Sequence, residues 1–429
     1  MSTIKDTIAF VVNLPDSAAI AIQQYAKSEK KTLKILLIQD VNMSTPKKEP
    51  LCDFLVVCDF TNPQAIARAL LPFQNRLLAI TCRSESNIAR FIQVIPHVSY
   101  LRTPSTESLR WATDKYEMRR RFRLYDKKRA LKFTLIKNAT KKEVKRVGEK
   151  VGFPMIVKPT NLAQSQLVSI CYHEEELEKT LKTTFRKIQS AYLNDKRIEV
   201  PKIMAEEYME GDMYSIDSYV NSRGKTYHCP LVRVKTGRDI GHDDFYNHLR
   251  ITPTRLRGEA VTRAQEAAEM AIRALALRST TTHTELMKID DDWRVIEVGP
   301  RIGGFRHKLH ELSCDINHSL NDVLIRIPKK PVLPKKCKGF AATLRYYPNK
   351  EGYIESLTGI KKIRDLQSFH DLDVKLKVGD KVLYSKNGGK GIFDLTLYNV
   401  ERHKLLADLR RVEKLVQVKV SNRPVKKPK

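Results

Sequence analysis

The segment Thr280–Gly304 holds the side chains best suited to chemistry in this sequence. It reads TTTHTELMKIDDDWRVIEVGPRIGG, with two strand-type runs flanking three aspartates at 290–292. A hairpin that turns at these aspartates pairs Glu285 with Glu297 and brings their Cβ atoms about 4.5–5.5 Å apart. Facing carboxylates repel unless a cation lies between them, and such oxygen pairs suit Mg²⁺ with substrate phosphates. The alternative is an exposed hairpin with solvated glutamates, which the apolar residues expected on the same face disfavour: Met287, Ile289 and Val295.

The same register predicts two further cross-strand pairs, Ile289 with Trp293 and Met287 with Val295. Four residues after Glu297 comes Arg301, followed by Gly303 and Gly304, where the backbone can approach a ligand closely.

Three shorter motifs offer groups that could bind a nucleotide. Lys158 ends the apolar strand in 152–160 (GFPMIVKPT), where its ammonium can point at a phosphate; the alternative is a lysine that reaches solvent from a strand end. The run 206–211 (EEYMEG) joins a carboxylate to extended backbone and a glycine turn, which can hold the amine and ring edge of a base; the alternative is solvated acids. The run 114–119 (DKYEMR) opens a basic helix, or is only a helix cap with surface charge.

The elements that must position these groups begin with an alternating α/β pattern over residues 7–113. Four apolar runs are typical of buried parallel strands: Thr7–Val12, Leu33–Gln39, Phe54–Cys58 and Leu77–Cys82. Between them we expect helices at Ser17–Lys30, Pro63–Leu71 and Ser84–Val94, the last two capped by Asn62 and Ser84. This alternation predicts a doubly wound α/β unit, and the lack of GxGxxG argues against a dinucleotide site there.

The rest of the chain divides into units with different patterns. Residues 114–150 are strongly basic and predict an exposed helical connection, and 151–210 predict strands at 155–158, 167–172 and 203–208 around a helix at 174–193. Residues 211–328 predict strands, a helix at 258–276 and the hairpin. A Pro/Lys-rich linker, 328–338, precedes a β-rich unit at 339–420, and we expect 421–429 to be a disordered basic tail. The α/β and α+β patterns together predict a multidomain chain.

Composition narrows the class of protein. The chain has 429 residues and a formal net charge of +29, which favours anionic partners, although the aromatic fraction of 7% and the lack of a nucleic-acid motif argue against a dedicated nucleic-acid binder. No apolar run reaches a membrane-spanning length, and Met1–Asp6 do not resemble a signal peptide. The seven cysteines lack CxxC or zinc-type spacing, which predicts a reduced, cytoplasmic protein without a structural metal.

In this order and spacing, the motifs resemble the ATP-grasp superfamily, and within it the carboxylate–amine ligases that act on amino acids. The resemblance covers nearly the whole chain: an N-terminal α/β pre-domain, the DK…MR helix, GFPMIVKP, EEY..G, HTE, IEVGPRIGG and a β-rich C-terminal domain. It implies the ATP-grasp fold, with a lid at about 150–205 and ATP with Mg²⁺ or Mn²⁺ as cofactors.

The resemblance also implies roles for individual residues. Lys115 and Lys158 would contact the ATP phosphates, as would the hydroxyl of Ser165 in the following loop. Glu206 would accept from the adenine amine, and the Met209 backbone would bond to the ring. Glu285 and Glu297 would bind the divalent ions, and Arg301 would steady the acyl phosphate. The substrate candidates are His283, His248 and Arg250. The alternative for His283 is a core histidine, and the alternative for His248 and Arg250 is a solvated loop.

Three positions depart from the superfamily pattern. The pattern has a ribose-binding glutamate seven residues after the position of Glu206, and this sequence has Met213 there. The ribose-binding role therefore moves to Asp212 or is lost. Gly299 replaces a metal-binding asparagine, and the phosphate loop 160–166 contains no glycine.

The expected activity is ATP-dependent ligation of a carboxylate to an amine through an acyl phosphate, forming an amide or peptide bond. The expected partners are a small acid and amine, with an acidic substrate or carrier suggested by the charge, and the chain could form a homodimer. One alternative is a carboxylase-type or purine-pathway ligase, for which carrier or bicarbonate features are not found. The other is a catalytically weakened protein that binds nucleotides or nucleic acid.

Overall fold

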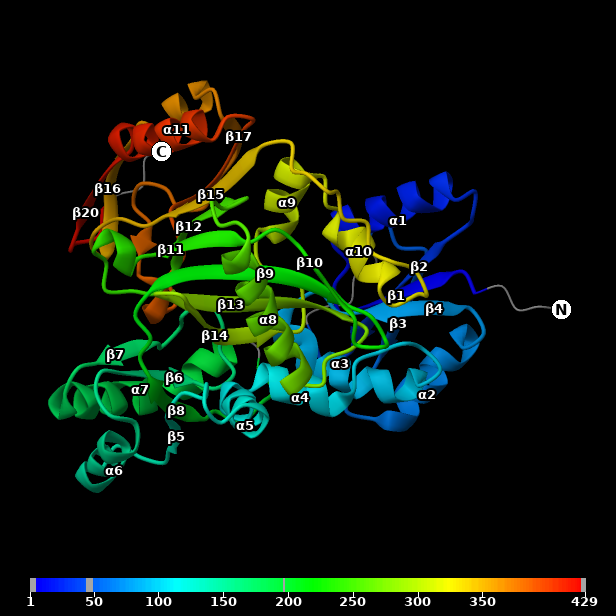
Figure 1. Ribbon diagram of the computed structural model, residues 1–429, viewed down its shortest axis with the longest axis horizontal. Helices are drawn as coiled ribbons and strands as arrows, with labels where there is room; N and C mark the ends of the chain where they lie inside the picture. Colours follow the sequence, from blue (N-terminus) through cyan, green and yellow to red (C-terminus); the bar gives the residue numbers. More distant parts are fainter. Residues whose placement is uncertain (1–4, 44–48, 196, 426–429) are drawn as a thin grey trace.

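Four β-sheets organise the chain in the computed structural model, which describes residues 5–43, 49–195 and 197–425 (Figure 1). The N-terminal unit lies at one end, and a long antiparallel sheet crosses the centre of the molecule (Figure 1). A smaller antiparallel sheet lies below the central sheet in this view, and the C-terminal strands and helix lie above it (Figure 1). Residues 1–4, which belong to the segment considered for a signal peptide, lie outside the described residues.

The N-terminal unit is the predicted doubly wound layer. Its parallel sheet has the order β3-β2-β1-β4, with bounds β1 Thr7–Val11, β2 Lys34–Asp40, β3 Phe54–Cys58 and β4 Leu77–Thr81. Its helices are α1 Asp16–Ser28, α2 Pro63–Leu70, α3 Ile88–Val94 and α4 Thr106–Thr113. Asn62 caps α2 as expected, whereas the side chain of Ser84 makes no capping hydrogen bond. A late helix, α10 (His318–Leu324), returns to pack against α1 and buries Val323 and Leu324 there.

The second unit is an antiparallel sheet with the order β5-β8-β6-β7. Its elements are α5 Lys115–Tyr125, β5 Phe133–Ile136, α6 Lys141–Val151, β6 Met155–Pro159, β7 Ser169–Cys171, α7 Glu174–Asn194 and β8 Ile203–Glu207. The prediction of an exposed helical connection at 114–150 is wrong, because this stretch contains β5 and because α5 buries Met118, Arg119 and Phe122. Strand β5 was not predicted because the segment is basic and because the partner strand, β8, lies some seventy residues later.

The central sheet follows the order β14-β13-β9-β11-β12-β15-β19-β17, and β10 pairs with β9. Its bounds are β9 Asp212–Val220, β10 Thr226–His228, β11 Val232–Thr236, β12 Asn247–Thr252, β13 Thr280–Ile289, β14 Asp292–Gly299, β15 Phe340–Tyr346, β17 Phe369–Val374 and β19 Phe393–Asn399. Helix α8 (Glu259–Ala274) packs on β13 and β14, and α9 (Arg306–Cys314) packs on β12 and β15. Because β12 pairs with β15, the strands on either side of the 328–338 linker share one sheet.

The C-terminal residues add a small sheet and a helix to this end of the molecule. The sheet has the order β18-β16-β20, with β16 Gly352–Thr358, β18 Lys381–Val382 and β20 Gln417–Ser421. Helix α11 (Arg402–Leu415) precedes β20, as the sequence predicts for this β-rich unit. Ser421, the first residue of the predicted disordered tail, is the last residue of β20, and 426–429 lie outside the described residues.

The β13–β14 hairpin has a two-residue turn, which changes the expected register. Asp290 and Asp291 form the turn, so Lys288 pairs with Trp293 and Met287 with Arg294, one residue away from the prediction. A bulge then leaves Ile296 without an opposite residue and restores the predicted pairing of Glu285 with Glu297. The register set by the turn pairs Val295 with Leu286 in the core, so Val295 does not share the glutamate face as expected.

The structure also changes the expected redox state of two cysteines. Cys314 and Cys337 form a disulfide, so the prediction of reduced cysteines throughout is wrong for this pair. In the part of the chain that the structure describes, no helix combines the length and apolar character that a membrane crossing requires.

Candidate functional site

A cavity of about 410 Å³ lies between the β5–β8 sheet and the β13–β14 hairpin, a volume typical of small-molecule sites. Seven of the residues singled out in the sequence line it: Lys115, Lys158, Ser165, Glu206, Met209, Glu285 and Glu297. These residues come from five separate segments, and the fold brings all of them to one cavity.

The two hairpin glutamates form one wall. Glu285 lies 3.5 Å from His283 Nε2, and Glu297 lies 3.3 Å from Lys115 Nζ. Met287 and the bulged Ile296 line the cavity beside them. Each carboxylate therefore has one cationic or histidine neighbour and still presents oxygen to the cavity.

The two lysines that line the cavity are buried and paired. Lys115, the first residue of α5, also donates to the Leu162 carbonyl at 2.9 Å. Burial opposes its charge, but Glu297 and Glu85 outweigh this and raise the pKa of Lys115, so it remains a cation. Lys158 on β6 donates to Glu206 Oε1 at 2.5 Å.

Glu206 is held by two cations. Arg119 donates through Nε to Oε2 at 2.8 Å and through Nη2 to Oε1 at 3.3 Å, while Lys158 shares Oε1. Burial favours the neutral acid, but Arg119 and Lys158 outweigh it and lower the pKa of Glu206 to about 2. Together, the buried side chains of Arg119, Lys158 and Glu206 carry one net positive charge beside the cavity. Both oxygens of Glu206 are engaged, so a role in binding an adenine amine stays a prediction.

Arg119 is a site residue to which the sequence analysis gave no role. It also donates to the carbonyls of Val295 and Ile296, at 3.1 and 2.6 Å. It therefore ties Glu206 to the bulge of the hairpin. The available signal was its spacing of four from Lys115, which puts both side chains on one face of α5.

Arg301 lies apart from the cavity and is paired with the N-terminal unit. Its guanidinium forms an ion pair with Glu85 and donates to the Ile302 carbonyl at 3.1 Å. Burial opposes ionisation of Glu85, but Arg301 and Lys115 outweigh it and lower the pKa of Glu85 to about 2. Among the described residues that line the cavity, Arg301 is missing, so its contact with a reaction intermediate remains a prediction. No local motif marked Glu85, which is more than two hundred residues away in sequence.

His283 belongs to a buried polar network behind Glu285. Asp217 accepts from His283 Nδ1 at 2.6 Å and from the Gly303 backbone N–H at 2.8 Å. Burial opposes the charge of the imidazole, but Asp217 outweighs it and raises the pKa of His283. Asp217 thus ties β13 to the glycine segment that follows β14, which is a positioning contact that the sequence analysis missed.

Asp212 and Ser165 make protein contacts. Asp212 forms an ion pair with Arg233, and Met213, at the position where the pattern expects a ribose-binding glutamate, lines the cavity instead. Ser165 lines the cavity while its hydroxyl donates to the Phe245 carbonyl at 3.0 Å.

His248 and Arg250 lie on β12, beyond the described lining of the cavity, whereas their neighbour Asn247 is part of it. His248 Nδ1 donates to the Arg345 carbonyl at 3.1 Å, and burial lowers the pKa of His248 to about 4. The Nη1 of Arg250 is buried and has no hydrogen-bond partner among the described residues. Arg250 is therefore a buried cation with spare donor capacity next to the site.

The glycine-free phosphate loop adopts the backbone that glycine usually supplies. Gln164, Ser165 and Leu167 have φ angles of 57°, 59° and 56°. Contacts from the C-terminal residues hold this conformation: Ser385 donates to the Gln164 carbonyl at 2.5 Å, and the Lys386 carbonyl accepts from Leu167 at 3.1 Å.

Comparisons with known proteins agree with this geometry. The sequence matches the model of the ATP-grasp domain family over residues 151–308. Alanine–anticapsin ligase of Bacillus amyloliquefaciens is 30% identical over 280 residues, which are 60% of this chain and 56% of that protein. The Bacillus subtilis (strain 168) protein of the same name is 30% identical over 247 residues, 53% of this chain and 49% of that protein. The chain thus spans about half the length of these curated relatives.

Solved structures resemble this one over nearly their whole length. L-amino acid ligase from Bacillus licheniformis superimposes with a TM-score of 0.76 at 16% identity, covering 97% of this chain and 99% of that one. N5-carboxyaminoimidazole synthetase from Staphylococcus aureus, complexed with ADP, gives a TM-score of 0.66 at 12% identity, covering 95% and 97%. The chain has the ATP-grasp fold, and residues 151–308 match the ATP-grasp domain family.

Proposed function

We propose that this protein is an ATP-dependent ligase that joins a carboxylate to an amine through an acyl phosphate. The observation that carries the proposal is the meeting of Glu285, Glu297, Lys115 and Lys158 in one cavity of nucleotide size. Phosphoryl transfer requires charge neutralisation and positioning, and this cavity offers both.

Magnesium, or manganese, fits the donor set of the hairpin. Glu285 and Glu297 are opposite each other in register and offer only oxygen, which hard divalent cations prefer. These two residues would hold the ion. Bound there, it would neutralise phosphate oxygens and help to orient the triphosphate.

The reaction that we propose has two steps. The γ-phosphoryl group of ATP passes to the substrate carboxylate and gives an acyl phosphate with ADP, and the amine then attacks the acyl carbon and expels phosphate. Lys115 and Lys158 neutralise the phosphates, and the β5–β8 sheet acts as a lid that keeps water from the acyl phosphate. Contact of Arg301 with this intermediate would compete with its ion pair to Glu85.

Amino acids are the substrate class that we favour. The relatives named above are ligases of alanine and of L-amino acids. Arg250, a buried cation with an unused Nη1, supports recognition of a substrate carboxylate, with His248 two residues away. The +29 charge further favours an acidic substrate or a charged carrier.

The test is to incubate the protein with ATP, Mg²⁺ and pools of amino acids and other small acids and amines, and to measure ADP, phosphate and ligated product. We expect substrate-dependent formation of all three, with kcat/KM at least about 100-fold lower in Glu297→Gln, since a metal-binding carboxylate supplies several kcal/mol.

The matched control is Asp291→Asn, which removes the same charge at the exposed turn of the same hairpin and should leave turnover unchanged. ATP binding without turnover in any pool would favour the catalytically weakened nucleotide-binding protein instead.

A further inference from the structure

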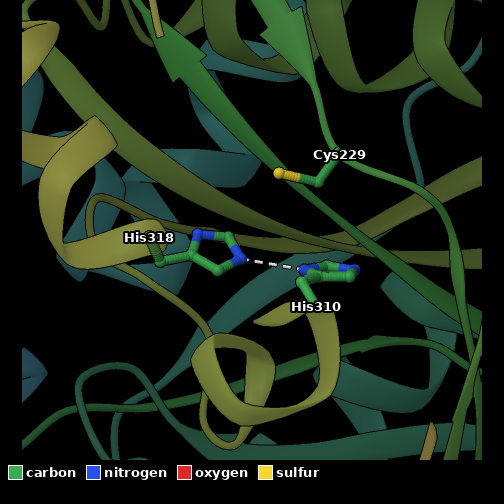
Figure 2. Close-up of side chains that lie close together, drawn as sticks. All are labelled: Cys229, His310 and His318. Carbon is green, nitrogen blue, oxygen red and sulfur yellow. Dashed lines mark hydrogen bonds between the residues drawn. The ribbon is translucent and has the colours of Figure 1, made fainter. Parts of the chain in front are cut away.

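Three buried side chains outside the cavity bring a thiol and two imidazoles together (Figure 2). Cys229 follows β10, His310 lies in α9, and His318 is the first residue of α10. One donor atom from each of them lies within 4.8 Å of the other two. In Figure 2 the sulfur of Cys229 lies above the two rings, and the dashed hydrogen bond joins one ring to the other. The sequence spacing gave no sign of this cluster because its members belong to three elements.

One nitrogen of each ring contacts an oxygen outside the cluster, and the other nitrogen faces the second ring. His310 Nε2 lies 3.0 Å from the Pro230 carbonyl, which can only accept, so Nε2 carries the proton and Nδ1 carries the lone pair. His318 Nδ1 lies 2.8 Å from the Tyr219 hydroxyl, which can donate or accept. His318 can therefore present either a proton or a lone pair at Nε2, which faces His310 Nδ1 at 2.8 Å.

This arrangement matches the outer contacts of histidines that bind metals. Such a histidine usually has its second ring nitrogen held by an oxygen, which sets the tautomer and the ring orientation. Tetrahedral zinc with nitrogen ligands at 2.0–2.1 Å requires a nitrogen–nitrogen separation of about 3.3 Å. The two rings need to open by only about 0.5 Å from their hydrogen-bonded separation of 2.8 Å.

We propose that Cys229, His310 and His318 form a binding site for a zinc-type divalent cation, which has a structural role. The three ligands are 2%, 0% and 1% exposed, so substrates do not reach them. The ion would join α9 and α10 to the end of β10. Helix α9 also carries Arg306, which donates to Ser215 on β9 at 2.7 and 3.1 Å beside the Asp217 network. The site therefore fixes a helix whose Arg306 contacts β9, the strand that carries Asp217, and takes no part in the chemistry of the cavity.

Metal binding requires neutral imidazoles and a thiolate. The proton of the Cys229 thiol passes to solvent as the cation binds, so the bound state carries a thiolate and two neutral imidazoles around the ion.

Cobalt provides a direct test because a thiolate ligand gives Co²⁺ a near-ultraviolet charge-transfer band that carboxylate sites lack. The full chain, with any affinity tag removed, is produced in medium supplemented with Zn²⁺ or Co²⁺ and dialysed with excess Mg²⁺ to clear the cavity glutamates. We expect a single zinc ion per chain by elemental analysis and the thiolate band in the cobalt form. The absence of both from the wild-type protein would overturn the proposal.

Variants separate this site from other cysteines. Cys229→Ser should abolish the thiolate band and retained zinc, and His318→Gln should reduce retained zinc. Cys171→Ser, which alters a buried thiol on β7, should keep both signals. Equal zinc and an equal band in Cys229→Ser would show that the metal lies elsewhere. If either variant fails to fold, the wild-type cobalt spectrum still decides the question.

Discussion

Single atoms decide the geometry around the hairpin glutamates. Gly303 lies so close to the Asp217–His283 pair that an added Cβ would stand 2.4 Å from His283 Nδ1 and 2.6 Å from Arg306 Cγ. Because His283 in turn contacts Glu285, a larger residue at position 303 would also displace Glu285 in the cavity. At Gly304, the next residue, an added Cβ would meet no atom within 4 Å.

We therefore predict opposite outcomes for two neighbouring substitutions. Gly303→Ala should destabilise the fold by about 1–3 kcal/mol, because a buried atom is forced against a hydrogen-bonded ring. It should also lower ATP turnover. Gly304→Ala should change stability by less than about 0.5 kcal/mol. Thermal unfolding and phosphate release measure both effects, and an equal response of the two variants would contradict this account.

At the scale of elements, the phosphate loop depends on the C-terminal residues. Left-handed backbone at Gln164, Ser165 and Leu167 is costly without glycine. The hydrogen bond from Ser385 to Gln164 and the one from Leu167 to Lys386 offset that cost. The absence of glycine is thus compensated from a distant part of the chain.

Ser385→Ala should loosen this loop. Loss of a hydrogen bond worth about 1 kcal/mol predicts a rise in the KM for ATP of about fivefold and faster amide exchange in residues 163–167. Ser190→Ala is the control, since its hydroxyl bonds to a backbone carbonyl at 2.9 Å on exposed α7. An unchanged KM for ATP and unchanged amide exchange in Ser385→Ala would show that the loop keeps its conformation without this hydrogen bond.

Local patterns allowed much of the element order to be predicted, and long-range contacts explain most of the misses. The apolar runs of the N-terminal sheet were recognisable because strands covered on both faces are continuously apolar. The pairing of Glu285 with Glu297 was also predicted, but a short turn and a bulge cancelled to produce it. The sequence did not predict the roles of Glu85, Asp217 and the Cys229 cluster, because their partners are far away in sequence.

At the scale of the whole molecule, buried carboxylates join the units to one another. Glu85 connects the N-terminal unit to Arg301, and Glu206 holds Arg119, which donates to the β13–β14 hairpin of the central sheet. Both carboxyl groups have a folded-state pKa of about 2, below the ordinary value of 4.5. A lowered folded pKa contributes stability above the ordinary pKa, and that contribution is lost as the pH falls through the folded value.

Acid should therefore unfold the protein within a defined range. We expect the urea midpoint to hold steady down to about pH 5 and to fall steeply between about pH 4.5 and about pH 2. Circular dichroism at a series of pH values measures this. A midpoint that stays constant to pH 3 would mean that these ion pairs do not contribute to stability.

The pairing of β12 with β15 limits how this chain can be shortened. A product that ends in the 328–338 linker would leave β12 with a bare row of backbone donors and acceptors. Exposed strand edges recruit other chains, so such a fragment should precipitate rather than behave as a minimal catalyst. Protein engineers who want a smaller version would do better to keep β15 and β19 and trim elsewhere.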